Sequence, residues 1–231
     1  IDNYFKEKED SPVDENGEYN FESLEALDIK LLNKQLKELA QGKKVYLPKY
    51  NFVEGKKEFS TVPTKLSEKC IILMEGLHSI NDKMTPDLDP ALKYKVYLSP
   101  FIPLNIDKHN YISTTDLRLL RRIVRDNRTR ATDVGETISY WNRVRDGEEK
   151  YIFPYINDIN RIVNTSLVYE VGVLKVYAEP LLYSVKSNSK AYNEARRLIN
   201  FLRGFFPIPS DYVTDDSILR EFIGKSIFES V

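Results

Sequence analysis

The stretch Cys70-Ile71-Ile72-Leu73-Met74-Glu75-Gly76 decides which fold this sequence predicts. An uninterrupted apolar run without period-two alternation is typical of a strand buried on both faces, in the middle of a parallel sheet. Open α/β sheets bind their ligands at the carboxyl ends of the strands, which is where Glu75 follows the run. An acid there predicts a hydrated Mg²⁺ shared with nucleotide phosphates. An ordinary solvated glutamate is the alternative.

Length and composition indicate a globular protein with one sizeable core. The chain has 231 residues, of which 42% are hydrophobic and 30% are charged, and its formal net charge is −1. That charge gives no electrostatic case for binding nucleic acid or an anionic membrane. A single cysteine excludes an internal disulfide and a cysteine-based zinc site. Since no apolar run approaches ~20 residues, we expect no membrane span and a cytoplasmic protein.

Strand and helix patterns alternate along the chain. Apolar spacing predicts helices over 23–41, 114–130, 133–145, 171–183 and 192–203. Short β-prone runs predict strands over 45–47, 94–98 and 161–164, a hairpin over 44–62, and a turn at 146–147. The alternation predicts an α/β fold whose parallel sheet is flanked by helices.

Arginines are concentrated in the helix predicted over 114–130. Six of them and no lysine lie between residues 118 and 130, and Arg118, Arg122 and Arg125 share one helix face. Guanidinium groups match the geometry of phosphate oxygens and stabilise charge on a transferred phosphoryl group. A solvated face paired with Asp116 and Asp126 is the alternative. The absence of lysine favours phosphate binding.

Four segments, in chain order, resemble the phosphoribulokinase/uridine kinase family of P-loop kinases. They are Asp2-Asn3-Tyr4-Phe5, Leu47-Pro48-Lys49-Tyr50-Asn51-Phe52, Ile72-Leu73-Met74-Glu75-Gly76-Leu77-His78, and the arginine-rich 116–130. The resemblance extends from Ile1 to about Leu182. It implies a truncated P-loop kinase-type parallel sheet in a core over 1–185, with the hairpin at 44–62, an arginine-rich lid at 114–148, and a helical C-terminal extension over 186–231.

The resemblance implies an ATP-dependent kinase that phosphorylates a nucleoside such as uridine, or a related sugar hydroxyl. Carried over by position, Asp2 is the general base, and Asp2 and Glu75 reach Mg²⁺. Glu22 grips the ribose hydroxyls and Tyr50 packs on the base. The lid arginines that act in catalysis are Arg122, Arg125 and Arg130.

Three positions depart from the family's pattern. Gly55 stands where uridine kinases carry a base-reading histidine, and Lys57 replaces an arginine. Thr132 stands where another lid arginine is usual. The first two departures leave the preference for a pyrimidine base open.

Kinases of this class need a G-x-x-x-x-G-K-[ST] loop to cradle the phosphates. The chain's Gly224-Lys225-Ser226 lacks the first glycine, because residue 219 is leucine. We therefore expect a fragment that lacks the N-terminal P-loop and is itself inactive. A non-catalytic, kinase-like module that binds a ligand or a partner is the alternative, and the neutral net charge argues against a third reading as an RNA-associated protein.

The missing first strand of such a sheet would lie between the strand that ends at Glu75 and the strand at 94–98. Unpaired backbone groups beside that gap are costly when they are buried. We therefore expect another chain's segment to fill the gap and form a homo-oligomer.

Overall fold

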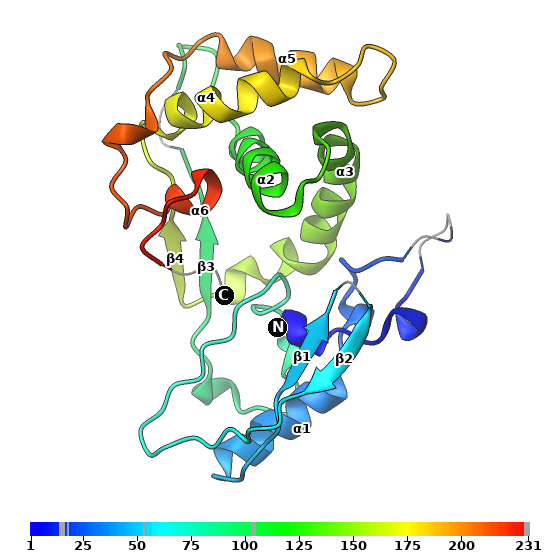
Figure 1. Ribbon diagram of the computed structural model, residues 1–231. Helices are drawn as coiled ribbons and strands as arrows, with labels where there is room; N and C mark the ends of the chain where they lie inside the picture. The colour runs from blue at the N-terminus through cyan, green and yellow to red at the C-terminus, as the bar shows by residue number, and fades with distance from the viewer. Residues whose placement is uncertain (14–16, 18, 53, 103–104, 229–231) are drawn as a thin grey trace. The chain divides into compact units, whose positions relative to one another are not determined.

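The computed structural model describes residues 1–13, 17, 19–52, 54–102 and 105–228 (Figure 1). The chain forms two compact units. The first contains Ile1–Tyr97 and Arg143–Arg161, and the second contains Leu98–Asn142 and Ile162–Val231. The helices on either side of residue 185 pack on each other in the second unit, and the boundary at that residue stays a prediction.

The core of the first unit forms around helix α1 (Ile29–Ala40). Asp28 caps this helix by accepting a hydrogen bond from the Leu31 backbone N–H at 3.0 Å. Leucines of α1 pack with Leu24, Leu27 and Met84 in one buried cluster. The helix is shorter than predicted, because residues 24–26 form a separate 3₁₀ turn that begins at Ser23. The apolar spacing that predicted a single helix therefore belongs to two elements, the 3₁₀ turn and α1.

The predicted hairpin is confirmed. Strands β1 (Pro48–Asn51) and β2 (Lys56–Phe59) pair antiparallel, with Pro48 opposite Phe59, and Val53 in the connection lies outside the described residues. Gly55 has φ +68°, and a Cβ there would lie 2.8 Å from the Lys8 Cβ. The Lys8 N–H donates to the Gly55 carbonyl at 3.0 Å. Glycine at this position therefore suits both the backbone conformation and the close approach of Lys8.

The central strand predicted at 70–76 is wrong. This segment forms no strand, and the side chains of Ile71 and Leu73 are 90% and 92% exposed. A strand is defined by hydrogen bonds to its neighbours, and none of the described segments forms a ladder beside this one. Among the described residues, no hydrogen bond joins 71–74 to 95–98. The two segments have therefore not closed up, and assembly into an oligomer stays a prediction.

A parallel strand pair accompanies the hairpin. It consists of β3 (Val96–Ser99) and β4 (Arg161–Asn164), which confirms two of the predicted strands. The Arg161 N–H donates to the Lys95 carbonyl and the Thr165 N–H to the Ser99 carbonyl, so both strands run in the same direction, as Figure 1 shows. With its helices, this pair and the hairpin give the α/β fold that was predicted, and this fold is consistent with a P-loop kinase type.

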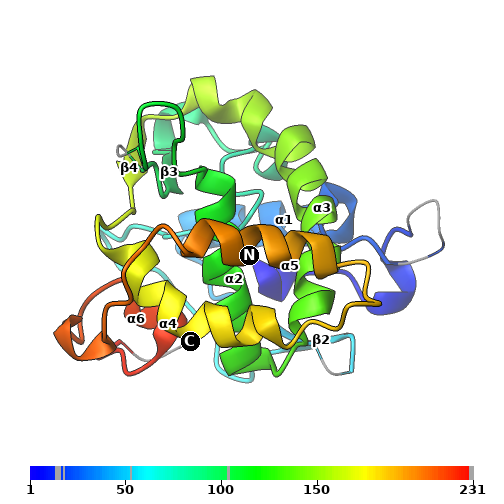
Figure 2. The same cartoon turned by 90° about the horizontal axis from the view of Figure 1, so that it is seen from above.

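The second unit is mainly helical. Helix α2 (Thr114–Arg130) buries Leu117, Leu120 and Ile123, and contacts α4 (Glu170–Tyr183) and α6 (Arg220–Ile223). Helix α5 (Tyr192–Leu202) packs on α4, and Figure 2 shows the two side by side. No helix in the described part of the chain has the length and apolar character needed to cross a membrane.

Helix α3 (Val134–Tyr151) has residues in both units and continues through the turn predicted at Asp146-Gly147. A Cβ at Gly147 would lie 3.3 Å from the Glu22 Cβ, within the first unit. The glycine therefore allows the segment with Glu22 to lie close against the helix. Gly147, which predicted a turn from the sequence, is instead a residue of α3 at which another segment packs closely.

Candidate functional site

The two predicted metal-binding acids lie on neighbouring backbone segments of the first unit. The Ile1 nitrogen donates a hydrogen bond to the Glu75 carbonyl at 2.8 Å, and Asp2 follows at once in the 3₁₀ turn η1 (Asp2–Tyr4). The Tyr4 hydroxyl donates to Gln35 Oε1 at 2.8 Å, which fixes this turn to α1. Both acids are exposed, and within the described residues no partner is bound to either carboxylate.

These acids fit the requirements of Mg²⁺. Carboxylate oxygens are its preferred protein ligands, and one or two suffice because water and phosphate oxygens complete the coordination. No group of three or more candidate metal-ligating side chains occurs in the described part of the chain. The donor set at Asp2 and Glu75 therefore suits a cation that shares its coordination with a substrate, and does not suit a permanent structural ion.

The hairpin is attached to the same turn. The Tyr50 backbone N–H donates to Asn3 Oδ1 at 3.2 Å, next to Asp2 in the chain. This contact brings the predicted base-packing residue onto the element that carries the predicted general base. The structure therefore gathers Asp2, Tyr50 and the Glu75 backbone in one region.

An aromatic cluster covers this junction. The Phe5 ring centroid lies 5.7 Å from that of Tyr50 and 6.0 Å from that of Phe52, and the Tyr50 and Phe52 centroids are 5.0 Å apart. Tyr50 is only 6% exposed, whereas Phe52 is 65% exposed. A planar ligand would therefore meet Phe52 more fully than Tyr50. Sequence reasoning missed Phe52, although the residue lies in the same segment that pointed to Tyr50.

Glu22 is held by contacts from two other elements. The His78 Nε2 lies 3.1 Å from the Glu22 carbonyl oxygen, and Gly147 of α3 approaches the Glu22 side chain. The Glu22 N–H donates to Asn20 Oδ1 at 3.2 Å. Glu22, which is partly exposed, therefore lies in a loop whose backbone is fixed.

His78 supports this loop in its neutral form. The side chain is buried beside Tyr151, with ring centroids 5.1 Å apart, and its Nδ1 has no hydrogen-bond partner. Burial lowers the pKa of His78, and the Glu22 carbonyl and the charge of Glu25 oppose that effect only in part. Charging the ring in the folded chain is therefore unfavourable.

We expect the stability of the chain to fall as the pH falls below about 6.5, the pKa of histidine in an unfolded chain. Between that pH and the lower pKa of His78 in the folded chain, the unfolded chain binds a proton at His78 and the folded chain does not. The loss of stability levels off once the pH is below the folded-state pKa, because both states are then protonated. Urea midpoints between pH 7.5 and 5.5 should show this slope in the wild type and lose it in His78→Gln.

The matched control is His109→Gln, because His109 is the chain's other histidine and is exposed. This variant should keep the slope. An unchanged slope in His78→Gln would contradict the assignment.

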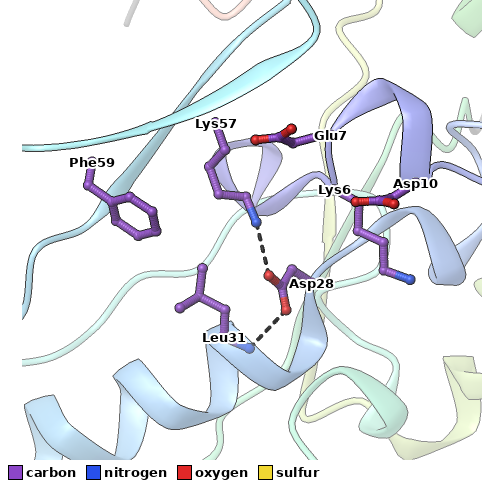
Figure 3. A pocket seen from close by; sticks show the side chains of 7 residues that line it. All are labelled: Lys6, Glu7, Asp10, Asp28, Leu31, Lys57 and Phe59. Carbon is purple, nitrogen blue, oxygen red and sulfur yellow. Dashed lines mark hydrogen bonds and ion pairs between the residues drawn. The ribbon is translucent and has the colours of Figure 1, made fainter.

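A separate pocket lies between the first ten residues, α1 and β2 (Figure 3). Its volume is about 340 Å³. Lys57 Nζ and Asp28 Oδ2 form an ion pair at 3.0 Å inside it, and Phe59 lies at its edge. Burial acts to raise the pKa of Asp28, but the hydrogen bonds from Leu31 and Lys57 outweigh it and lower the pKa. None of the predicted site residues lines this pocket.

The predicted lid arginines lie in the second unit and share one carboxylate. Arg122 Nε lies 3.1 Å from Asp126 Oδ2, Arg130 Nη1 lies 3.2 Å from Oδ1, and Arg125 Nε lies 3.6 Å from Oδ1. Asp126 is buried, Arg122 and Arg125 are partly buried, and Arg130 is exposed. One carboxylate thus faces three guanidinium groups, which leaves positive charge available to an anion.

Two further arginines of α2 have structural contacts instead. Arg121 forms a two-point ion pair with the fully buried Glu170 and donates to the Thr165 carbonyl at 2.8 Å. Arg128 donates to the Glu221 and Phe222 carbonyls at 2.7 and 3.0 Å, at the end of α6. Arg121 and Arg128 therefore hold neighbouring elements, whereas Arg122, Arg125 and Arg130 share Asp126.

Comparisons with known proteins agree with the resemblance of the motifs. The model of the phosphoribulokinase/uridine kinase family matches residues 5–171. Uridine kinases of Staphylococcus aureus strains JH9, Newman and JH1 are each 29% identical to this chain over 154 residues. The match covers 66% of this chain and 66% of each relative, so the chain spans about two thirds of the length of these curated relatives.

Proposed function

Since this chain belongs to the phosphoribulokinase/uridine kinase family, we propose that it serves the ATP-dependent phosphorylation of a nucleoside, with uridine as the first candidate. The observation that carries the proposal is the junction of η1 with the hairpin and the Glu75 backbone. This junction supports a shared site for an acid, an aromatic surface and a second acid. A nucleoside offers a hydroxyl, a planar base and two ribose hydroxyls to such a site.

Asp2 is the proposed general base. Its exposed carboxylate accepts the proton of the sugar hydroxyl as that oxygen attacks the γ-phosphorus of ATP and the bond to the β,γ-bridging oxygen breaks. Glu22 accepts hydrogen bonds from the ribose hydroxyls, because an ionised carboxylate has only acceptor oxygens. Tyr50 holds Phe52 in place, and both present ring atoms to the base.

Asp2 and Glu75 would hold Mg²⁺, which neutralises charge on the phosphate oxygens when it is bound. The guanidinium groups of Arg122, Arg125 and Arg130 bind the transferred phosphoryl group, where negative charge is spread over three oxygens. Thr132, in place of a further lid arginine, leaves this task to the three arginines that share Asp126.

The proposal is tested first by equilibrium binding. We expect uridine to bind the purified chain in isothermal titration calorimetry, and Phe52→Ala to weaken binding by about tenfold or more, because base–aromatic stacking contributes ~1–3 kcal/mol. Phe59→Ala is the matched control, since Phe59 is also an exposed aromatic residue of the hairpin but lines the separate pocket. If only the Phe59 variant lost uridine binding, uridine would bind in that pocket and the proposal would be contradicted.

The 231 residues contain no G-x-x-x-x-G-K-[ST] sequence. We therefore expect this chain alone to bind uridine without phosphorylating it from ATP, because nothing else in the sequence offers a phosphate cradle of that kind. Uridine phosphorylation by the purified chain that Asp2→Asn abolishes would contradict this expectation. Binding of uridine without any activity in the natural gene product would favour a non-catalytic, ligand-binding module.

A further inference from the structure

The carboxylate of Asp126 lies at the centre of the arginine cluster on α2. Asp126 is 3% exposed, whereas Glu221, which pairs with Arg125, is exposed. Arg122 precedes it by four residues and Arg130 follows it by four, so both lie on the same helix face, one turn away on either side. This spacing allows one carboxylate to hold two guanidinium groups at once.

The hydrogen bonds divide the two oxygens of Asp126 between these arginines. Oδ2 accepts from Arg122 Nε at 3.1 Å and Oδ1 accepts from Arg130 Nη1 at 3.2 Å. Arg125 is held less tightly. Its Nε is buried without a hydrogen bond, 3.6 Å from Oδ1, and its Nη1 lies 3.5 Å from the exposed carboxylate of Glu221 on α6. The cluster therefore has two oriented guanidinium groups and a third with donors to spare.

The charge balance of the cluster favours an anion. Three guanidinium groups face one buried carboxylate. The only other acid that the ion pairs place beside them, Glu221, offsets part of the charge of Arg125 and does not pair with Arg122 or Arg130 in the described contacts. Neighbouring arginines would repel one another and separate without the central acid. Arg128 is occupied by carbonyls of α6, and Asp116 by Arg197, so neither changes this balance.

We infer that Asp126 is a positioning residue that aligns Arg122, Arg125 and Arg130 to receive a polyphosphate. The inference rests on the proposed function, in which these arginines bind the phosphates of ATP. The Asp126 side chain aligns the donors, while its backbone carbonyl separately accepts the N–H groups of Ala131 and Thr132 that end the helix. Replacing the side chain therefore leaves the helix end intact.

The direction in which the affinity for tripolyphosphate changes in Asp126→Asn distinguishes alignment of the arginines from an effect of their charge alone. Inorganic tripolyphosphate is titrated into the chain at fixed salt. Asp126→Asn adds one net positive charge, so a cluster that acts only through its charge would bind tripolyphosphate more tightly. Alignment predicts the reverse, a loss of about tenfold or more, because small displacements of binding groups are costly. Asp126→Glu, which keeps the charge, should recover part of the loss.

The matched control is Asp116→Asn. Asp116 lies on the same helix and forms a two-point ion pair with Arg197 at 2.7 and 2.8 Å, outside the cluster. It adds the same charge and should leave tripolyphosphate affinity equal to or higher than that of the wild type. Tighter or unchanged binding in Asp126→Asn would overturn the inference and leave the proposed function standing.

A measurement on the wild-type chain covers the case in which Asp126→Asn fails to fold. The Nε–H groups of Arg122 and Arg130 should be rigid by ¹⁵N relaxation in the absence of any ligand, whereas that of Arg145, in an exposed pair with Glu149, should be mobile. Equal mobility would overturn the alignment. If the wild type does not bind tripolyphosphate, the ligand of the cluster is wrong and the lid part of the proposed function fails with it, whereas uridine binding is unaffected.

Discussion

Replacing Arg121 with methionine should lower the free energy of unfolding by about 3–5 kcal/mol, because it leaves the buried Glu170 carboxylate without its positively charged partner. Glu170 is fully buried, and both of its carboxylate oxygens accept hydrogen bonds from Arg121. The Arg121 guanidinium also faces the Phe222 ring, 4.9 Å from its centroid. Thermal and urea unfolding of the purified chain measure the loss.

The control is Lys37→Ala, which removes an exposed pair with Asp87 and should cost at most ~1 kcal/mol. The double variant Arg121→Met with Glu170→Leu should recover much of the stability, since two apolar side chains leave no buried charge unpaired. A loss in Arg121→Met no larger than in Lys37→Ala would show that Arg121 is free for another role, such as phosphate binding.

Replacing Asp2 with asparagine should lower kcat for uridine phosphorylation by roughly 10²–10⁴-fold in the natural gene product, since asparagine cannot accept the proton of the attacking hydroxyl. The KM for uridine should change far less, because proton transfer occurs only in the transition state. Initial rates over a range of uridine and ATP concentrations give both quantities.

Asp10→Asn is the control, because Asp10 is also an exposed acid in a short 3₁₀ turn near the N-terminus. It should leave kcat unchanged. A kcat in Asp2→Asn equal to that of Asp10→Asn would assign the base to another residue.

Local patterns predicted many of the elements correctly. Helix α2 lies where its apolar spacing predicted a helix, β4 was placed to the residue, and the hairpin was recognised from two β-prone runs around a glycine. The signals for these elements lie within short stretches of sequence, although the partner of β4, strand β3, is distant in the chain. The motifs that contain Asp2, Tyr50 and Glu75 could be recognised because each lies within a few consecutive residues, and the roles of these residues stay predictions.

The predictions failed where contacts between segments distant in the sequence determine the local structure. The run that ends at Glu75 is apolar enough for a buried strand, yet a strand needs hydrogen-bonded neighbours, and no described segment supplies them. The turn predicted at Asp146-Gly147 is part of helix α3, in which Gly147 leaves room for the segment with Glu22. The residues of each segment by themselves indicate neither the lack of a neighbouring strand nor the close approach at Gly147.

The sequence alone determined that α2 carries arginines on one face, since helix periodicity follows from the order of residues. Only the tertiary structure decided what each arginine does. Arg121 pairs with Glu170 and Arg128 with carbonyls of α6, at sequence separations of 49 and more than 90 residues. Arg122, Arg125 and Arg130 share the carboxylate of Asp126. Charge and spacing are local properties, but the partner that satisfies a buried charge is set by which elements pack against it.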